Sequence, residues 1–263
     1  ASWAPWKSPQ TTRNQDTGPI GTVRIKVTVK DNNLVPGLAG IPAAESAISY
    51  IDGQVGVLEY RGLPIEVLAE KSTFEEVCWL LLYGKLPTQA ELDTFKQQLV
   101  EQRAVPQKVF DLLAALPADG HPMAALSIGY NALGMTSAPC NVLDSAARQL
   151  AYAQLIASTP VLIAAHSRLR QGKKVVPTDP KLDIAADFLW MLNGEKPADL
   201  VARVLDVALI LHADHTMNAS TFTGRVVAST EADPYAVCAA AVGSLSGPLH
   251  GGANERVLQQ LEK

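Results

Sequence analysis

The chain is poor in charge, in aromatic side chains and in cysteine. Charged residues make up 18% of its 263 residues and aromatic residues 6%, and the formal net charge is −4. It therefore lacks the basic excess with which proteins bind nucleic acid. The three cysteines, Cys78, Cys140 and Cys238, are too few and too scattered for a disulfide framework, which favours a reducing compartment.

Long uninterrupted apolar runs are also lacking. The longest candidates, such as residues 205–215, are broken by charged side chains, so we expect no membrane span and no membrane partner. The first fifteen residues have no secretory signal; they are free of acids before Asp16, so a transit-peptide remnant is the weaker alternative. We expect a cytoplasmic protein, with a mitochondrial or plastid matrix less favoured.

The apolar content of 48% is enough to bury the core of one large domain. Residues 1–21 show no periodicity and predict a flexible arm, whose Trp3 and Trp6 pack loosely on its own domain or dock on a partner. Residues 22–62 predict a short β element, with a strand alternating from Val23 to Val29 and a hairpin turn at Asp52-Gly53.

Residues 63–263 predict a helical domain. Ser72 and Glu75 form a possible capping box for a helix that ends at Gly84, and Thr88 and Glu91 form another, for a helix to about residue 103. Further helices are expected near 106–116, 122–136, 143–158, 160–171, 181–193, 197–212, 217–230, 233–246 and 252–263. The fold class is therefore all-α with a small N-terminal β element.

Three helical segments are apolar on nearly every side. They cover residues 160–165, 201–214 and 233–245. Helices of this kind are typical of the inside of a bundle, so we expect all three to be buried.

Polar side chains gather where the apolar segment 201–214 ends. His212 and His215 are one helical turn apart, and Asn218 follows three residues later. A zinc site is disfavoured, because neither a H-E-x-x-H motif nor paired cysteines are present. His212 fits a helix-end cap. His215 and Asn218 could bind an anionic, oxygen-rich ligand, or could equally be capping residues.

His250 precedes Gly251 and Gly252, which remove side chains beside it, and a helix is expected directly afterwards. The positive end of that helix disfavours a protonated ring, and a neutral imidazole there could polarise a carbonyl. A phosphate-binding loop and a nucleophile elbow both fail on their motifs. An incidental histidine in a helix–helix turn is the alternative.

Taken together, the motifs resemble the citrate synthase family, most closely its shorter bacterial type. The resemblance rests on PLHGGANE at 248–255 and LHADHTMNAST at 211–221, supported by residues 37–69, 81–92 and the GHPM at 120–123, in the order that the family shows.

The resemblance implies condensation of acetyl-CoA with oxaloacetate to give citrate and CoA. His250 would donate to the forming enolate, while His215 and Asn218 would bind oxaloacetate. It also implies no permanently bound cofactor and a homodimer or higher multiple of dimers.

The family's aspartate base, second histidine and oxaloacetate-binding arginines have no match here. We therefore expect the chain to carry part of the active site and to be inactive alone. A methylcitrate synthase, or a non-catalytic helical module in an assembly, are the alternatives.

Overall fold

The computed structural model describes residues 44–252 and residue 256. The arm at 1–21 and the strand expected at 23–29 lie outside these residues, as does nearly all of the helix expected at 252–263.

A small antiparallel sheet, in the order β1-β2-β3, comes first in the described chain. Its strands are β1 (Ser49–Asp52), β2 (Val57–Tyr60) and β3 (Leu63–Pro64). The hairpin between β1 and β2 is confirmed, but its connection is not a two-residue Asp52-Gly53 turn. It has four residues, 53–56, because the amide of Gln54 donates to Asp52 Oδ1 at 2.9 Å and Gly56 takes a φ of 75°.

The rest of the described chain is helical, as expected. Its helices are α1 (Ile65–Lys71), α2 (Phe74–Tyr83), α3 (Gln89–Gln102), α4 (Gln107–Ala114), α5 (Pro122–Thr136), α6 (Ser145–Leu169), α7 (Ile184–Asn193), α8 (Asp199–His212), α9 (Ala219–Ala228) and α10 (Pro234–Leu245). The prediction of an all-α fold with a small β element is confirmed over these residues.

The capping box of helix α2 lies one residue later than predicted, although the helix itself begins at Phe74 as expected. Its capping box is formed by Thr73 and Glu76, not by Ser72 and Glu75: Glu76 Oε2 accepts from the Thr73 amide at 2.7 Å. Ser72 instead ends α1, and Glu75 turns into the interior. The end of α2 at Gly84, with a φ of 80°, is as predicted.

The sequence predicts two helices divided at Pro160, near 143–158 and 160–171. This prediction is wrong, because the structure has one helix, α6. It runs unbroken for 25 residues with Pro160 inside it. A proline in a helix interior costs about 3 kcal/mol, because it lacks an amide hydrogen and crowds the preceding turn. Both halves of α6 are buried, with Leu155 before the proline and Leu162 after it, and this packing offsets the cost.

Helix α8 is not buried on all sides, contrary to expectation. Asp206 and Ile210 face the interior, whereas Leu200 is 74% exposed and Val204 62% exposed. Apolar residues all round a helix predict burial, but only one face of α8 has neighbours among the described residues.

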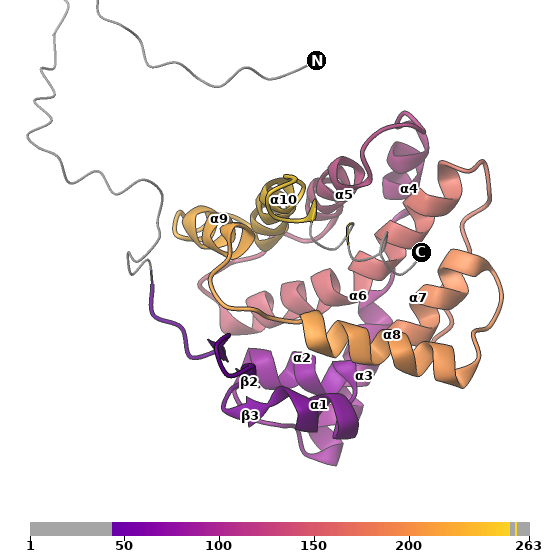
Figure 1. Ribbon diagram of the computed structural model, residues 1–263. Helices are drawn as coiled ribbons and strands as arrows, with labels where there is room; N and C mark the ends of the chain where they lie inside the picture. The colour runs from indigo at the N-terminus through magenta and orange to yellow at the C-terminus, as the bar shows by residue number, and fades with distance from the viewer. Residues whose placement is uncertain (1–43, 253–255, 257–263) are drawn as a thin grey trace, which may run out of the picture. The chain divides into compact units, whose positions relative to one another are not determined.

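The core of the described chain lies in four clusters of buried residues. In the largest one α5, α6 and α10 meet around Leu133, Leu162 and Tyr235, and Figure 1 shows α10 beside α5 and α9. In the second, Tyr60 of β2 packs with Leu80 of α2 and with α8. The sheet is thereby fixed to the end of α8.

The sequence predicts no membrane span, yet helix α6 is long and apolar enough to cross a membrane by length and composition alone. Within its most apolar window, 56% of the residues are buried inside the fold, as in the core helix of a globular protein.

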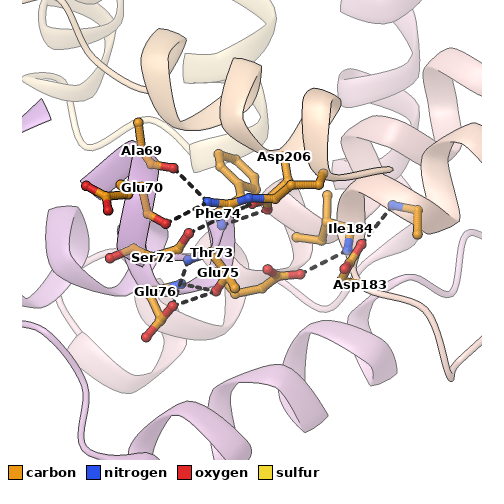
Figure 2. A network of polar contacts seen from close by, with 12 residues as sticks. Ala69, Glu70, Ser72, Thr73, Phe74, Glu75, Glu76, Asp183, Ile184 and Asp206 are labelled. Carbon is orange, nitrogen blue, oxygen red and sulfur yellow. Dashed lines mark hydrogen bonds and ion pairs between the residues drawn. The ribbon is translucent and has the colours of Figure 1, made fainter. Parts of the chain in front are cut away.

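A polar network joins α1, α2, α7 and α8 (Figure 2). Glu75 Oε1 accepts from the Ile184 amide at the start of α7 at 2.9 Å, and Asp206 Oδ1 accepts from the Phe74 amide at the start of α2 at 2.8 Å. Arg203 donates to the carbonyl oxygen of Ser72, at the end of α1. Carboxylates thus cap two helix starts and a guanidinium caps a helix end, as the helix dipole favours.

Glu75 offers a test of this network. Burial raises the pKa of its carboxyl, and the hydrogen bond from Ile184 offsets only part of that effect. E75A should lose about 1–3 kcal/mol of unfolding free energy, because it leaves the buried Ile184 amide without an acceptor. E75Q keeps an oxygen acceptor for that amide and should lose less unfolding free energy. Urea denaturation measures both losses.

Comparison of the wild type with E75Q also predicts how the stability depends on pH. Because the folded-state pKa of Glu75 is raised, the folded protein holds this proton more tightly than the unfolded chain. The wild type should therefore lose stability relative to E75Q as the pH rises above about 4.5, the ordinary value for this group. Equal stabilities for E75A and E75Q would contradict the capping role.

Candidate active site

Asn218 begins helix α9. Its Oδ1 accepts from the Thr221 amide at 2.8 Å, which is the usual N-cap bond. This bond fixes the amide orientation, so that Nδ2 is the atom facing His215, at 3.0 Å from Nε2 of that ring. Since Nδ2 can only donate, His215 accepts at Nε2, and a neutral His215 carries its hydrogen on Nδ1.

His250 lies in the turn after α10. The amide of Gly251 donates to the carbonyl oxygen of Leu245 at 3.0 Å, and a Cβ added at Gly251 would lie 2.2 Å from that oxygen. Gly251 is therefore required for the chain to turn here. A Cβ at Gly252 would meet nothing nearer than 3.9 Å. The space that Gly251 leaves free of a side chain is thus occupied by backbone.

The two segments meet at their polar side chains. Nε2 of His250 lies 2.9 Å from Ser220 Oγ, in the first turn of α9. The rings of His215 and His250 are 6.3 Å apart between centroids, with their planes at 78°. The structure thus brings together His215, Asn218 and His250, the three residues singled out in the sequence. His215 is exposed, and the other two are half-buried.

Ser220 was missed in the sequence analysis. Its hydroxyl lies 2.7 Å from Asn218 Oδ1 and has one hydrogen to share between that oxygen and His250. If the hydrogen points to Asn218, Nε2 of His250 is the donor to Ser220; if it points to His250, a neutral ring carries its hydrogen on Nδ1. The sequence signal that could have identified Ser220 is its place two residues after Asn218, the residue that caps α9.

The β hairpin supports the loop that carries His215. Tyr60, fully buried, has its hydroxyl 3.0 Å from the carbonyl oxygens of Ile210 and Asp214. The carboxylate of Asp214 accepts from the hydroxyl of Ser49 on β1 and from the Thr216 amide. Burial raises the pKa of Tyr60, so its hydroxyl stays protonated and available to donate.

His212 lies apart from this group. Its Nδ1 is 2.7 Å from the Ala208 carbonyl oxygen, one turn back on α8, and its side chain is exposed. His212 therefore contacts a carbonyl within its own helix and none of the candidate site residues, and its role as a helix-end cap stays a prediction.

The carboxylate next to His215 in the chain is already hydrogen-bonded. Asp214, next to His215 in the chain, has its carboxylate engaged with Ser49 and Thr216. Within residues 44–252, no carboxylate hydrogen-bonds to His215, Asn218 or His250. The described part of the site therefore offers hydrogen-bond donors, and no carboxylate base in contact with these three side chains.

Comparison with known proteins identifies the fold that holds this site. The family model described as "Citrate synthase, C-terminal domain" matches residues 37–263. The chain belongs to the citrate synthase family. Among solved structures, the citrate synthase of Pyrobaculum aerophilum superposes with a TM-score of 0.81 at 38% identity, covering 91% of this chain and 63% of that one.

Curated members of the citrate synthase family extend further than this chain. The citrate synthase of Synechocystis is 49% identical over 227 residues, which are 86% of this chain and 57% of that protein. The 2-methylcitrate synthase of Shewanella oneidensis is 41% identical, over 86% of this chain and 60% of that protein. The chain thus spans about three fifths of the length of these relatives.

Proposed function

We propose that the chain carries part of the active site of an acyltransferase that condenses acetyl-CoA with oxaloacetate to give citrate and CoA. The observation that supports this best is the meeting of His250 with His215 and Asn218, from two segments about thirty residues apart, in a chain of the citrate synthase family. Acetyl-CoA is a substrate in this proposal, and no permanently bound cofactor is required.

The difficult step is removal of a proton from the methyl carbon of a thioester, which is a very weak acid. A base takes the proton, and the electron pair of the C–H bond moves onto the thioester oxygen to form an enolate. A hydrogen-bond donor aimed at that oxygen lowers the barrier. The enolate carbon then bonds to the carbonyl carbon of oxaloacetate, the π electrons of that carbonyl move onto its oxygen, and the oxygen takes up a proton to become the hydroxyl of the product. Water then cleaves the thioester to leave a carboxylate and release CoA.

We assign the enolate donor to Nδ1 of His250. A neutral ring donates from Nδ1 only when Nε2 is an acceptor, so Ser220 must turn its hydroxyl hydrogen from Asn218 toward Nε2. The 2.9 Å contact between Ser220 and His250 permits this. In this proposal Ser220 sets the tautomer of the ring without touching the substrate.

Oxaloacetate would lie against the neighbouring donors. His215 has a hydrogen on Nδ1 when its Nε2 accepts from Asn218, and Asn218 Nδ2 has a second hydrogen beyond the one given to His215. Both can donate to the carboxylate or carbonyl oxygens of the substrate. The base comes from a residue outside the described part of the chain.

The test is an assay of free thiol release. It compares the protein produced from the whole open reading frame that encodes the chain with a protein of residues 1–263 alone. We expect turnover of oxaloacetate with acetyl-CoA by the former and none by the latter. Robust turnover by residues 1–263 would contradict the proposal of a partial site. Propionyl-CoA is run in parallel: preference for it would indicate a 2-methylcitrate synthase, and no turnover with either thioester would favour a non-catalytic module.

Asn218 has two roles that one pair of variants separates. N218D keeps an N-cap acceptor for Thr221 but replaces the Nδ2 donor by a negative charge, whereas N218S keeps a cap without that charge. With N218D we expect oxaloacetate to bind more than about tenfold more weakly, the loss of one hydrogen bond to a charged group, with an unchanged melting temperature. Titration calorimetry measures this.

N218S should retain more affinity than N218D and melt at the same temperature. If Asn218 only caps the helix, both variants will bind oxaloacetate as the wild type does, and its assignment to the substrate is wrong.

We also propose that copies of the protein associate as a homodimer or a multiple of dimers. Met135, at the end of α5, is 89% exposed, and Leu143, in the connection to α6, is 72% exposed. Exposed apolar side chains mark a contact surface only where they form a patch, so this proposal rests mainly on membership of the citrate synthase family. Light scattering of a monomer would contradict this proposal.

A further inference from the structure

His166 on α6 has no counterpart in the function proposed above. Its side chain is 7% exposed, and neither ring nitrogen has a hydrogen-bond partner among the described residues. Buried polar atoms in folded proteins are almost always paired, and an exception calls for a physical explanation. A missing ligand is one such explanation when a cavity adjoins the group.

A cavity of about 300 Å³ does adjoin His166, between α5, α6 and α7. Its walls are mostly apolar: Pro122, Met123, Leu126, Leu162, Phe188 and Leu192. Small-molecule sites are usually apolar hollows with a few polar groups that orient the ligand, and about 300 Å³ is at the lower end of their size range. None of the residues of the candidate active site lines this cavity.

The polar end of the cavity is positively charged. Arg170 is the C-cap residue of α6, four residues after His166; it also lines the cavity and makes no ion pair within the described chain. Burial, and then the nearby charge of Arg170, lower the pKa of His166. The ring is therefore neutral at neutral pH, with one nitrogen that donates and one that accepts.

We propose that this cavity binds a small carboxylic acid with an apolar body. The body packs against the apolar walls, and the carboxylate lies between the N–H of His166 and the guanidinium of Arg170. An ionised ligand is favoured over a neutral one because Arg170 makes no ion pair with any residue that the structure describes, and hydrogen bonds to a charged group are the stronger kind. This ligand is not a substrate of the proposed reaction, and its site is separate from His250.

The test is calorimetric titration of the full chain with octanoate, with octan-1-ol as the neutral probe of the same length. We expect octanoate to bind, and octan-1-ol to bind roughly 10–100-fold more weakly, the effect of one charge-assisted hydrogen bond. H166F preserves a ring in the wall but removes both nitrogens, and R170Q removes the charge at an exposed position. Each should weaken octanoate binding by about tenfold or more and leave octan-1-ol unchanged.

H212Q is the matched control, because His212 is exposed at the end of α8 and does not line the cavity. It should bind octanoate as the wild type does. Nuclear magnetic resonance of the His166 ring adds a measurement without any substitution: bound octanoate should raise the pKa of His166. Equal affinity for the two probes, no octanoate binding, or unaltered binding by R170Q would each overturn the proposal.

Discussion

Replacing His250 by alanine is expected to lower kcat for citrate formation by about 10²–10³-fold, with a smaller change in KM. This is the loss observed when one donor to a developing oxyanion is removed, about 2.7–4 kcal/mol of transition-state stabilisation. The effect falls on kcat because the enolate oxygen carries its charge only after proton removal. Free thiol release by the product of the whole reading frame measures it.

H212A is the control for this variant. His212 is an exposed histidine on the neighbouring segment, and its ring is bonded to the Ala208 carbonyl of its own helix. H212A should turn over at nearly the wild-type rate. Near-normal kcat in H250A, or an equal loss in H212A, would remove His250 from the proposed mechanism.

Replacing Asp187 by alanine should cost about 3–5 kcal/mol of unfolding free energy, the usual loss when one partner of a buried ion pair is removed. Asp187 is 1% exposed, and its Oδ2 lies 2.8 Å from Nη1 of Arg103, which is 4% exposed. Burial raises the pKa of Asp187, while the Asp179 amide and Arg103 oppose that shift. The variant leaves a buried guanidinium without its counter-charge.

Urea denaturation of D187A can be compared with that of K85A. Lys85 pairs with Glu91 at 2.9 Å, but its side chain is 63% exposed, so water and salt screen the attraction. K85A should therefore be much less destabilised than D187A. Similar losses in the two variants would show that the Arg103–Asp187 pair contributes no more than an exposed one.

Local features of the fold could be predicted where a few neighbouring residues decide them. Gly84 ends α2 because it adopts a positive φ readily, and Thr88 with Glu91 opens α3 as predicted. At the start of α2 the sequence offers two overlapping boxes, Ser72 with Glu75 and Thr73 with Glu76. The second forms because Glu75 caps α7, a helix more than a hundred residues away in sequence.

Contacts between distant segments decided what the sequence analysis misjudged. Pro160 ends a helix in a local argument, but burial on both sides keeps α6 continuous through it. The apolar side chains of α8 predicted burial all round, yet Leu200 and Val204 are exposed. Periodicity reports how many apolar faces a helix has, and the neighbours available determine how many are covered.

The same division holds at the candidate active site. The sequence by itself determined the residue types, His215 and Asn218 at one helix junction and His250 before a glycine pair, because each is set by a short motif. Only the tertiary structure decided that Ser220 joins Asn218 to His250 and that Tyr60 fixes the loop of His215. Hydrogen bonds between distant segments depend on how the helices pack, and no local pattern encodes that packing.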